Sequence, residues 1–315
     1  MLTGNTFAFD WEVSLMEWLQ TNLGDGFISV ISFFSAFGEE LLLVLILGVL
    51  FWGYDKKIGR TVGLNALMGL VWSPMIKNVF LRRRPYFDHE GIKILRVVDK
   101  SADANDIAAQ GFSFPSGHST NAVTVYASIA GQIKKRWLAC LAVVLPLLVG
   151  FSRVVIGAHY PTDVLAGWAL GLLCICVVSL LWKAIKNELA LYGVLLLTAL
   201  PGLFYCKSAD YFTSLGLMLG FMTGDQLEQR KVRFENTHNL LRCLLRALGG
   251  AAIFFALNTL LKLPFPKDFL DSASFAALMV RCLRYAVTAF ALFGVYPIAF
   301  KYTDRLWNHA RGEKA

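Results

Sequence analysis

The chain has little charge for its length. Of its 315 residues, 17% are charged and 56% are hydrophobic, whereas about a quarter of the residues in a typical soluble domain carry charge. The apolar residues also occur in long blocks, and a helix needs about 20 apolar residues to cross a bilayer. This composition excludes an ordinary soluble domain and predicts an all-α, polytopic membrane protein.

The sequence also lacks the usual signs of a signal peptide, a metal site or a cofactor. The first twenty residues contain no Lys or Arg, so they lack the basic start of a cleavable signal sequence. Their Trp11, Leu15, Trp18 and Leu19 have helical spacing, which predicts an amphipathic helix at the membrane interface. The six cysteines have the spacing of neither a disulfide framework nor a zinc site. We therefore expect neither a disulfide framework nor a zinc site, and the sequence suggests no cofactor.

The apolar runs predict nine membrane helices in the residues that follow. Their expected ranges are 38–53, 61–81, 117–133, 137–156, 162–184, 188–205, 209–224, 243–262 and 279–301.

The net charge of +8 has a distribution that fits membrane topology. Lys and Arg cluster in every second connection between the apolar runs, as expected of cytoplasmic loops, and this pattern argues against a nucleic-acid partner. The predicted cytoplasmic segments are 56–60, 134–136, 183–186, 230–233 and 301–314. The connection 82–116 is basic although it falls on the opposite side, so its charge needs another use. A solvated excursion and a substrate-entry element both remain open for this long segment.

Three segments at predicted helix ends carry polar side chains. KNVFLRRRP places Lys77 and Arg84 two helical turns apart, on one face of a helix that Pro85 would end. In FPSGHS, Ser116 stands where an N-cap belongs, and Gly117 has no side chain to block a ligand.

The third segment, SRVVIGAHYPTD, contributes Arg153, His159 and Asp163. Pro161 suits the first position of a helix, so His159 should lie just ahead of that helix and Asp163 in its first turn. Because all three segments border helices on the same predicted side of the membrane, we expect these side chains and His118 to converge.

The converging groups suit phosphate chemistry. Helix N-termini offer amide donors and a partial positive charge. Lys77, Arg84 and Arg153 add full charges that can grip phosphate oxygens and stabilise a phosphoryl transition state.

The two histidines suggest a division of roles. His159 has a carboxylate four residues on, in Asp163, which is the pattern of an activated nucleophile or base. His118 lies beside the expected phosphate cradle and could protonate a leaving oxygen.

The order and spacing of these residues resemble the three-part signature of the type 2 phosphatidic acid phosphatase superfamily. The matching residues are Lys77, Arg84, Pro85, Pro115, Ser116, Gly117, His118, Ser152, Arg153, His159 and Asp163. The resemblance covers roughly residues 60–185.

The resemblance implies metal-independent hydrolysis of a lipid phosphate or diphosphate. It implies that His159 attacks phosphorus to form a phosphohistidine with support from Asp163, and that His118 protonates the leaving alcohol. The residues that it assigns to the phosphate are Lys77, Arg84, Ser116, Gly117 and Arg153.

The resemblance also implies a six-helix phosphatase core, which we place at residues 38–205. An interfacial helix and entry segment (1–37) would precede it, and about three additional C-terminal membrane helices (206–315) would follow. The layout is loosely similar to sphingosine-phosphate phosphatase-type members and their bacterial relatives. A homodimer interface, a lipid gate and a second function remain open for the additional helices.

Other functions remain open as alternatives. The extra helices also suit a transporter or flippase of phosphorylated lipids, and the same pocket suits a lipid phosphotransferase. The expected partners are a phosphorylated lipid substrate and membrane lipids. We expect a multi-pass protein, with the bacterial plasma membrane preferred and the endoplasmic reticulum open. The charge pattern then predicts an active site that faces the periplasm, the exterior or the lumen.

Overall fold

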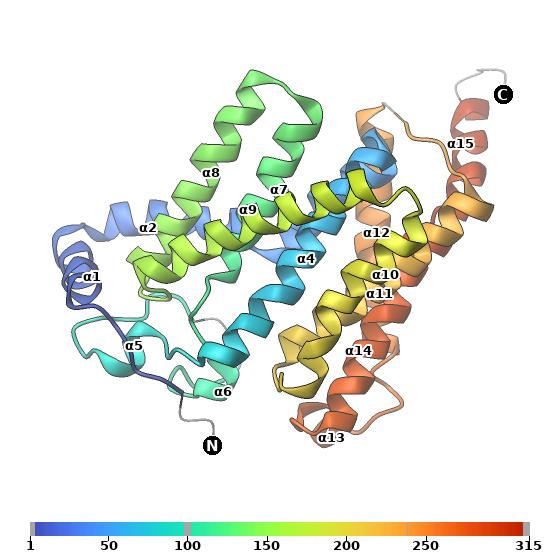
Figure 1. Cartoon of the computed structure of the whole chain (residues 1–315). Helices are drawn as coiled ribbons and strands as arrows, with labels where there is room; N and C mark the ends of the chain where they lie inside the picture. The colour runs from blue at the N-terminus through green and yellow to red at the C-terminus, as the bar shows by residue number, and fades with distance from the viewer. Residues whose placement is uncertain (1–3, 98–101, 238, 311–315) are drawn as a thin grey trace. The chain divides into compact units, whose positions relative to one another are not determined.

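The structure, a computed structural model, describes residues 4–97, 102–237 and 239–310 (Figure 1). Within these ranges the chain is helical and forms no strand, with one isolated bridge between Asn5 and Arg82. Each predicted membrane-helix range contains a helix, so the all-α prediction is confirmed. The end of the predicted cytoplasmic segment 301–314 lies outside the described residues.

The helices divide into two compact units. The first comprises residues up to 44, 61–186 and 201–208, and the second comprises 45–60, 187–200 and 209 onward. Helix α4 (Lys56–Phe80) begins in the second unit and continues through the first. The predicted division at residues 37 and 205 stays a prediction.

The first unit contains most of the helices that border the polar segments. They are α1 (Asp10–Asn22), α2 (Asp25–Phe33), η1 (Phe34–Gly38), most of α4, α5 (Pro85–Asp88), α6 (Ile107–Gln110), α7 (Gly117–Ile133), α8 (Arg136–Val155) and α9 (Pro161–Ala184). Helix α7 packs against both α8 and α9. An added Cβ at Gly167 would lie 2.6 Å from the carbonyl oxygen of Ser116. This close approach brings the start of α7 against the start of α9.

Helix α1 is amphipathic, as predicted, and it packs on the first unit with one face. Met16 and Leu19 are buried with residues of α8 and α9. Trp11 and Trp18 are 51% and 58% exposed, which suits a helix at a membrane interface. Leu19 belongs to the buried face and not to the exposed apolar face to which its spacing assigned it.

The second unit contains helices that the phosphatase signature does not cover. They are η2 (Val49–Tyr54), α10 (Glu188–Ala199), α11 (Ala209–Leu227), η4 (Glu228–Val232), α12 (Leu240–Leu260), α13 (Lys267–Asp271), α14 (Phe275–Phe290), η5 (Ala291–Val295) and α15 (Ile298–Ala310), and α3 (Glu40–Gly48) leads into this unit. Helix α11 packs closely on α14 and η5 through Gly216, Gly220 and Gly224, since an added Cβ at any of them would meet backbone atoms.

Four helical runs among the described residues are long and apolar enough to cross a membrane: 136–155, 161–184, 240–260 and 275–304. The broken pair 25–38 and 40–54 gives a fifth if it forms one span. Four of the predicted membrane helices fall outside this set: α4, α7, α11 and the shorter apolar run 188–204. Helix α7 has 17 residues, and α4 and α7 both carry polar side chains that are buried inside the protein, among them Asn65 and Ser73 of α4 and Thr120 and Ser128 of α7.

Candidate active site

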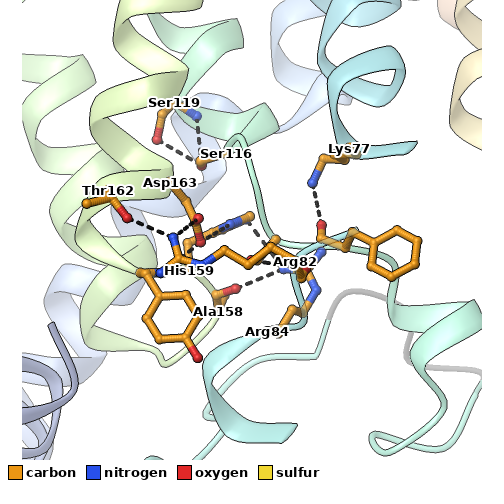
Figure 2. A network of polar contacts seen from close by, with 12 residues as sticks. Lys77, Arg82, Arg84, Ser116, Ser119, Ala158, His159, Thr162 and Asp163 are labelled. Atoms are coloured by element: carbon orange, nitrogen blue, oxygen red, sulfur yellow. Dashed lines mark hydrogen bonds and ion pairs between the residues drawn. The ribbon is translucent and has the colours of Figure 1, made fainter. Parts of the chain in front are cut away.

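The end of α4 supplies the first cations of the site. Lys77 lies in the last turn of α4 and donates from Nζ to the carbonyl oxygen of Phe112 at 2.6 Å (Figure 2). The helix ends at Phe80, and Leu81 has a φ of 52°, so the chain turns away before Arg84. The expectation that Lys77 and Arg84 share a helical face is therefore wrong. Pro85 likewise begins the short helix α5, since proline suits the first helical position.

Arg84 is held by backbone carbonyls and directed toward His159. Its Nε donates to the carbonyl oxygens of Gln110 and Gly111 at 2.9 and 3.0 Å. Its Nη1 donates to the carbonyl oxygen of Ala158 at 2.9 Å and lies 3.4 Å from His159 Nε2. These bonds fix the guanidinium before any substrate arrives, which is the arrangement that stabilises developing charge.

The start of α7 provides a cap and an open space. Ser116 Oγ accepts from the backbone N of Ser119 at 3.4 Å, and the backbone N of Ser116 donates to the carbonyl oxygen of Asp163 at 2.9 Å. An added Cβ at Gly117 would meet only Ser73 Oγ, at 3.8 Å, so this position leaves room for a ligand. His118 follows in the first turn of α7 and acts electrostatically on His159.

Arg153 brings a buried charge from the last turn of α8. Its side chain is 3% exposed, and its Nη1 lies 3.5 Å from Ser35 Oγ. Its Nε has no hydrogen-bond partner within the described protein. A buried guanidinium with an unmet donor is costly, and an anion in the site would remove that cost.

His159 lies between Arg84 and Asp163 (Figure 2). Its Nδ1 is 3.6 Å from Asp163 Oδ2, which is longer than a hydrogen bond and within the range that tightens when a substrate binds. Burial lowers the pKa of His159 well below its ordinary value, and the nearby charges of Arg84, Lys77 and Arg153 lower it further. The imidazole is therefore neutral, with Nε2 on the side of Arg84.

Arg82 is a central residue that the sequence analysis missed. Its Nη1 donates to Asp163 Oδ1 and to Thr162 Oγ1, each at 2.7 Å, and its Nη2 donates to Glu12 Oε2 at 2.8 Å. The guanidinium also lies 3.9 Å from the centre of the Tyr160 ring. Asp163 is thus oriented by Arg82 on one oxygen and by the backbone N of Tyr160, at 2.8 Å, on the other.

Glu12 of α1 is the second residue that the sequence analysis missed. Its Oε1 accepts from the backbone N and from Oγ1 of Thr162, at 3.0 and 2.5 Å. Burial alone would raise the pKa of Glu12, but hydrogen bonds from Thr162 and Phe9 and the charge of Arg82 hold it below the ordinary value. The helix spacing contained the signal, because Glu12 shares the buried face of Met16 and Leu19.

All the sequence-predicted site residues lie in the first unit, and the charges of Lys77, Arg84 and Arg153 reach His159. Four basic side chains, the fourth being Arg82, thus outweigh the carboxylates of Asp163 and Glu12 in this part of the protein. The described residues contain no group of three or more potential metal ligands of the His, Cys, Asp or Glu type. The arrangement can bind an anion and present a neutral imidazole to it.

Comparison with known proteins agrees with this arrangement. Residues 58–186 match the family described as the PAP2 superfamily, and residues 212–305 match the transmembrane extension of PAP2 superfamily phosphatases. A decaprenylphosphoryl-5-phosphoribose phosphatase of Mycobacterium tuberculosis is 30% identical over 51% of this chain and 84% of its own length. The chain belongs to the PAP2 superfamily.

Two other relatives are similar over comparable lengths. An undecaprenyl-diphosphatase of Sulfolobus acidocaldarius is 28% identical over 54% of this chain and 78% of its own length. An undecaprenyl-diphosphatase of Bacillus subtilis is 29% identical over 46% of this chain and 69% of its own length. The family and the enzyme class predicted from the sequence, a membrane hydrolase of lipid phosphates or diphosphates, are confirmed at this level. The match at 212–305 also relates the C-terminal helices to the family, for which the sequence analysis had only a loose similarity of layout.

Proposed function

We propose that this PAP2 protein hydrolyses a lipid phosphate or diphosphate without a metal, through a phosphohistidine at His159. The position of His159 carries the proposal: Nδ1 faces Asp163 Oδ2 at 3.6 Å and Nε2 faces Arg84 Nη1 at 3.4 Å. Asp163 can therefore hold the proton on Nδ1, which leaves the lone pair of Nε2 free on the cationic side.

In the first step, the lone pair of His159 Nε2 attacks phosphorus and forms a P–N bond. The P–O bond to the leaving group breaks, and His118 gives a proton to the leaving oxygen. Burial and the charges of Arg153 and Arg84 lower the pKa of His118 well below its ordinary value in the free site, so His118 must take up this proton when the anionic substrate binds. Arg84, Arg153 and Lys77 stabilise the charge on the other phosphoryl oxygens. The unmet Nε donor of Arg153 supports this role.

In the second step, water attacks the phosphohistidine. His118, now neutral, takes a proton from the water, the P–N bond breaks, and inorganic phosphate leaves. His159 recovers its lone pair, and the proton on Nδ1 stays beside Asp163 throughout. The enzyme returns to its starting state without an external oxidant, reductant or metal.

We further infer that the site faces the extracytoplasmic side. The site groups lie at the end of α4, the start of α7, the end of α8 and the start of α9. The opposite ends of α7, α8 and α9 carry the basic segments 134–136 and 183–186, which the positive-inside rule assigns to the cytoplasm. A membrane-impermeant phosphorylated substrate added to sealed right-side-out vesicles tests this orientation, since a cytoplasmic site would give no phosphate release until detergent is added.

The central test uses purified full-length protein and a lipid with a radiolabelled terminal phosphate. The reaction is quenched with alkali and not with acid, because phosphohistidine is acid-labile. We expect the alkaline quench to preserve a labelled phosphoenzyme. His159→Gln should remove both the label and the release of phosphate. Arg83→Gln is the control, because Arg83 lies between Arg82 and Arg84 in the sequence and pairs with Asp88 outside the site. Normal turnover by purified His159→Gln protein would refute the proposal.

A further inference from the structure

A cavity lined by both polar and apolar side chains lies in the first unit. It has a volume of about 760 Å³ and is lined by α2 and by residues 93–97 of the long basic segment, including Arg96. Gln20 of α1 anchors that segment by bonding the backbone N and carbonyl oxygen of Lys93, both at 2.9 Å. Leu95 adds a backbone bond of 3.1 Å to Ile156 at the end of α8. The cavity wall is therefore fixed to the same elements that hold the cradle.

The α2–η1 segment connects this cavity to the cradle. Ser32 of α2 lines the cavity, and Ser35 in η1 contacts both Arg153 and Ser152, the latter at 2.8 Å between hydroxyl oxygens. An added Cβ at Gly38 would lie 2.8 Å from the carbonyl oxygen of His118. The segment thus runs from the cavity, past Arg153, to the backbone of His118.

Arg96 stands at this junction with Glu39 as its partner. The two side chains form an ion pair while remaining 34% and 37% exposed. The charge of Arg96 reaches both His118 and Arg153. Ion pairs with this exposure are weak, so a ligand phosphate can replace the Glu39 carboxylate at Arg96.

We propose that Arg96 and the adjoining cavity form a second anion subsite, which binds the phosphate that remains on the leaving lipid. The inference rests on the proposed function and names its substrate class, a lipid diphosphate. Asp25 and Lys93 also line the cavity and carry opposite charges, so Arg96 gives the lining its net positive charge. The volume lies within the usual range of about 300 to 1,000 Å³ for ligand pockets.

The subsite acts on the first chemical step. His159 attacks the terminal phosphorus, and the P–O bond to the bridging oxygen breaks. The bridging oxygen takes the proton from His118 and stays on the lipid monophosphate that leaves. Arg96 neutralises that second phosphate as it gains charge, and Glu39 recovers its partner when the product departs.

The test compares a prenyl diphosphate with the prenyl monophosphate of the same chain, using purified full-length protein in detergent. Because a charge-assisted contact is lost, we expect Arg96→Gln to lower the diphosphate-to-monophosphate ratio of kcat/KM by about tenfold or more. Glu39→Gln should raise the same ratio, because it frees Arg96. Arg83→Gln is the matched control and should leave the ratio at the wild-type value, since Arg83 pairs with Asp88 and does not line the cavity.

Each outcome decides the proposal. An unchanged ratio in Arg96→Gln would overturn the subsite. The proposed function would remain intact in that case as long as the wild type releases phosphate. Release from neither lipid by the wild type would overturn the proposed function itself. If Arg96→Gln fails to fold, the ratio in Glu39→Gln decides: an increase supports the subsite, and no change overturns it.

Discussion

Arg82 donates a 2.7 Å hydrogen bond to Asp163 and thereby connects the N-terminal helix to the proposed nucleophile. The same guanidinium donates to Glu12 of α1 at 2.8 Å, so one buried cation holds two buried carboxylates. Buried charges of this kind are tolerated only when they are paired and hydrogen-bonded. The geometry of the site therefore depends on a helix that lies far from the signature residues in the sequence.

Arg82→Met should be strongly destabilising. It removes the shared partner of Glu12 and Asp163 and leaves two buried carboxylates uncompensated, and breaking a buried pair costs about 3 to 5 kcal/mol. Thermal or chemical unfolding in detergent measures the loss. Arg83→Gln, on the neighbouring and more exposed arginine, should stay close to wild type. Equal stability of the two variants would contradict the role of Arg82.

Glu12 should make stability depend on pH in the acid range. Its pKa is lowered in the folded state, so the stabilisation is fully present above the ordinary value of 4.5 and is lost as pH falls through the folded-state pKa. We expect the wild type to lose stability below that ordinary value, and Glu12→Gln to lose less over the same interval. Parallel unfolding curves at several pH values test this. An identical acid dependence in both proteins would exclude Glu12 as the cause.

The sequence correctly predicted those features of the site that depend on local helix-start preferences and on short sequence spacing. Pro161 does begin a helix, Ser116 does cap one, and His159 and Asp163 lie as the spacing predicted. These features are local, because helix-start preferences act within one turn.

The sequence was less informative wherever a long-range contact decides the structure. The helical-face prediction for Lys77 and Arg84 failed because Leu81 adopts a left-handed conformation that ends the helical path. Of the basic residues in 82–116, the sequence analysis gave a role to Arg84 and none to Arg82, although the two are alternate residues of an extended segment. Only the folded chain shows that Arg82 reaches Glu12, since no local preference pairs residues so far apart.

The pH profile should report a neutral His159 in the free enzyme. Burial and then the charges of Arg84, Lys77 and Arg153 lower its pKa, so the nucleophile stays deprotonated well below the ordinary value of 6.5. We therefore expect kcat/KM to decline with falling pH only below that value. Phosphorus NMR of the substrate alone gives the titration of the lipid phosphate, which must be separated from that of the enzyme. An acid limb centred at or above the ordinary value would contradict this state of His159.

Asp163→Asn should slow formation of the phosphoenzyme much more than it weakens binding. The amide keeps the size of the side chain but can donate to Nδ1, which would put the proton on Nε2 and remove the attacking lone pair. A comparable exchange in a catalytic triad lowers kcat by about 10⁴-fold.

Thr162→Val is the matched control for this change. It removes one acceptor of Arg82 and one donor to Glu12 but leaves the Arg82–Asp163 bond in place. Rapid-quench measurement of the labelled phosphoenzyme, with KM measured separately, distinguishes the two variants. Both variants weaken the buried network, but only Asp163→Asn changes the partner of His159. If Asp163→Asn slowed formation of the phosphoenzyme no more than Thr162→Val, the carboxylate would serve only to hold that network together.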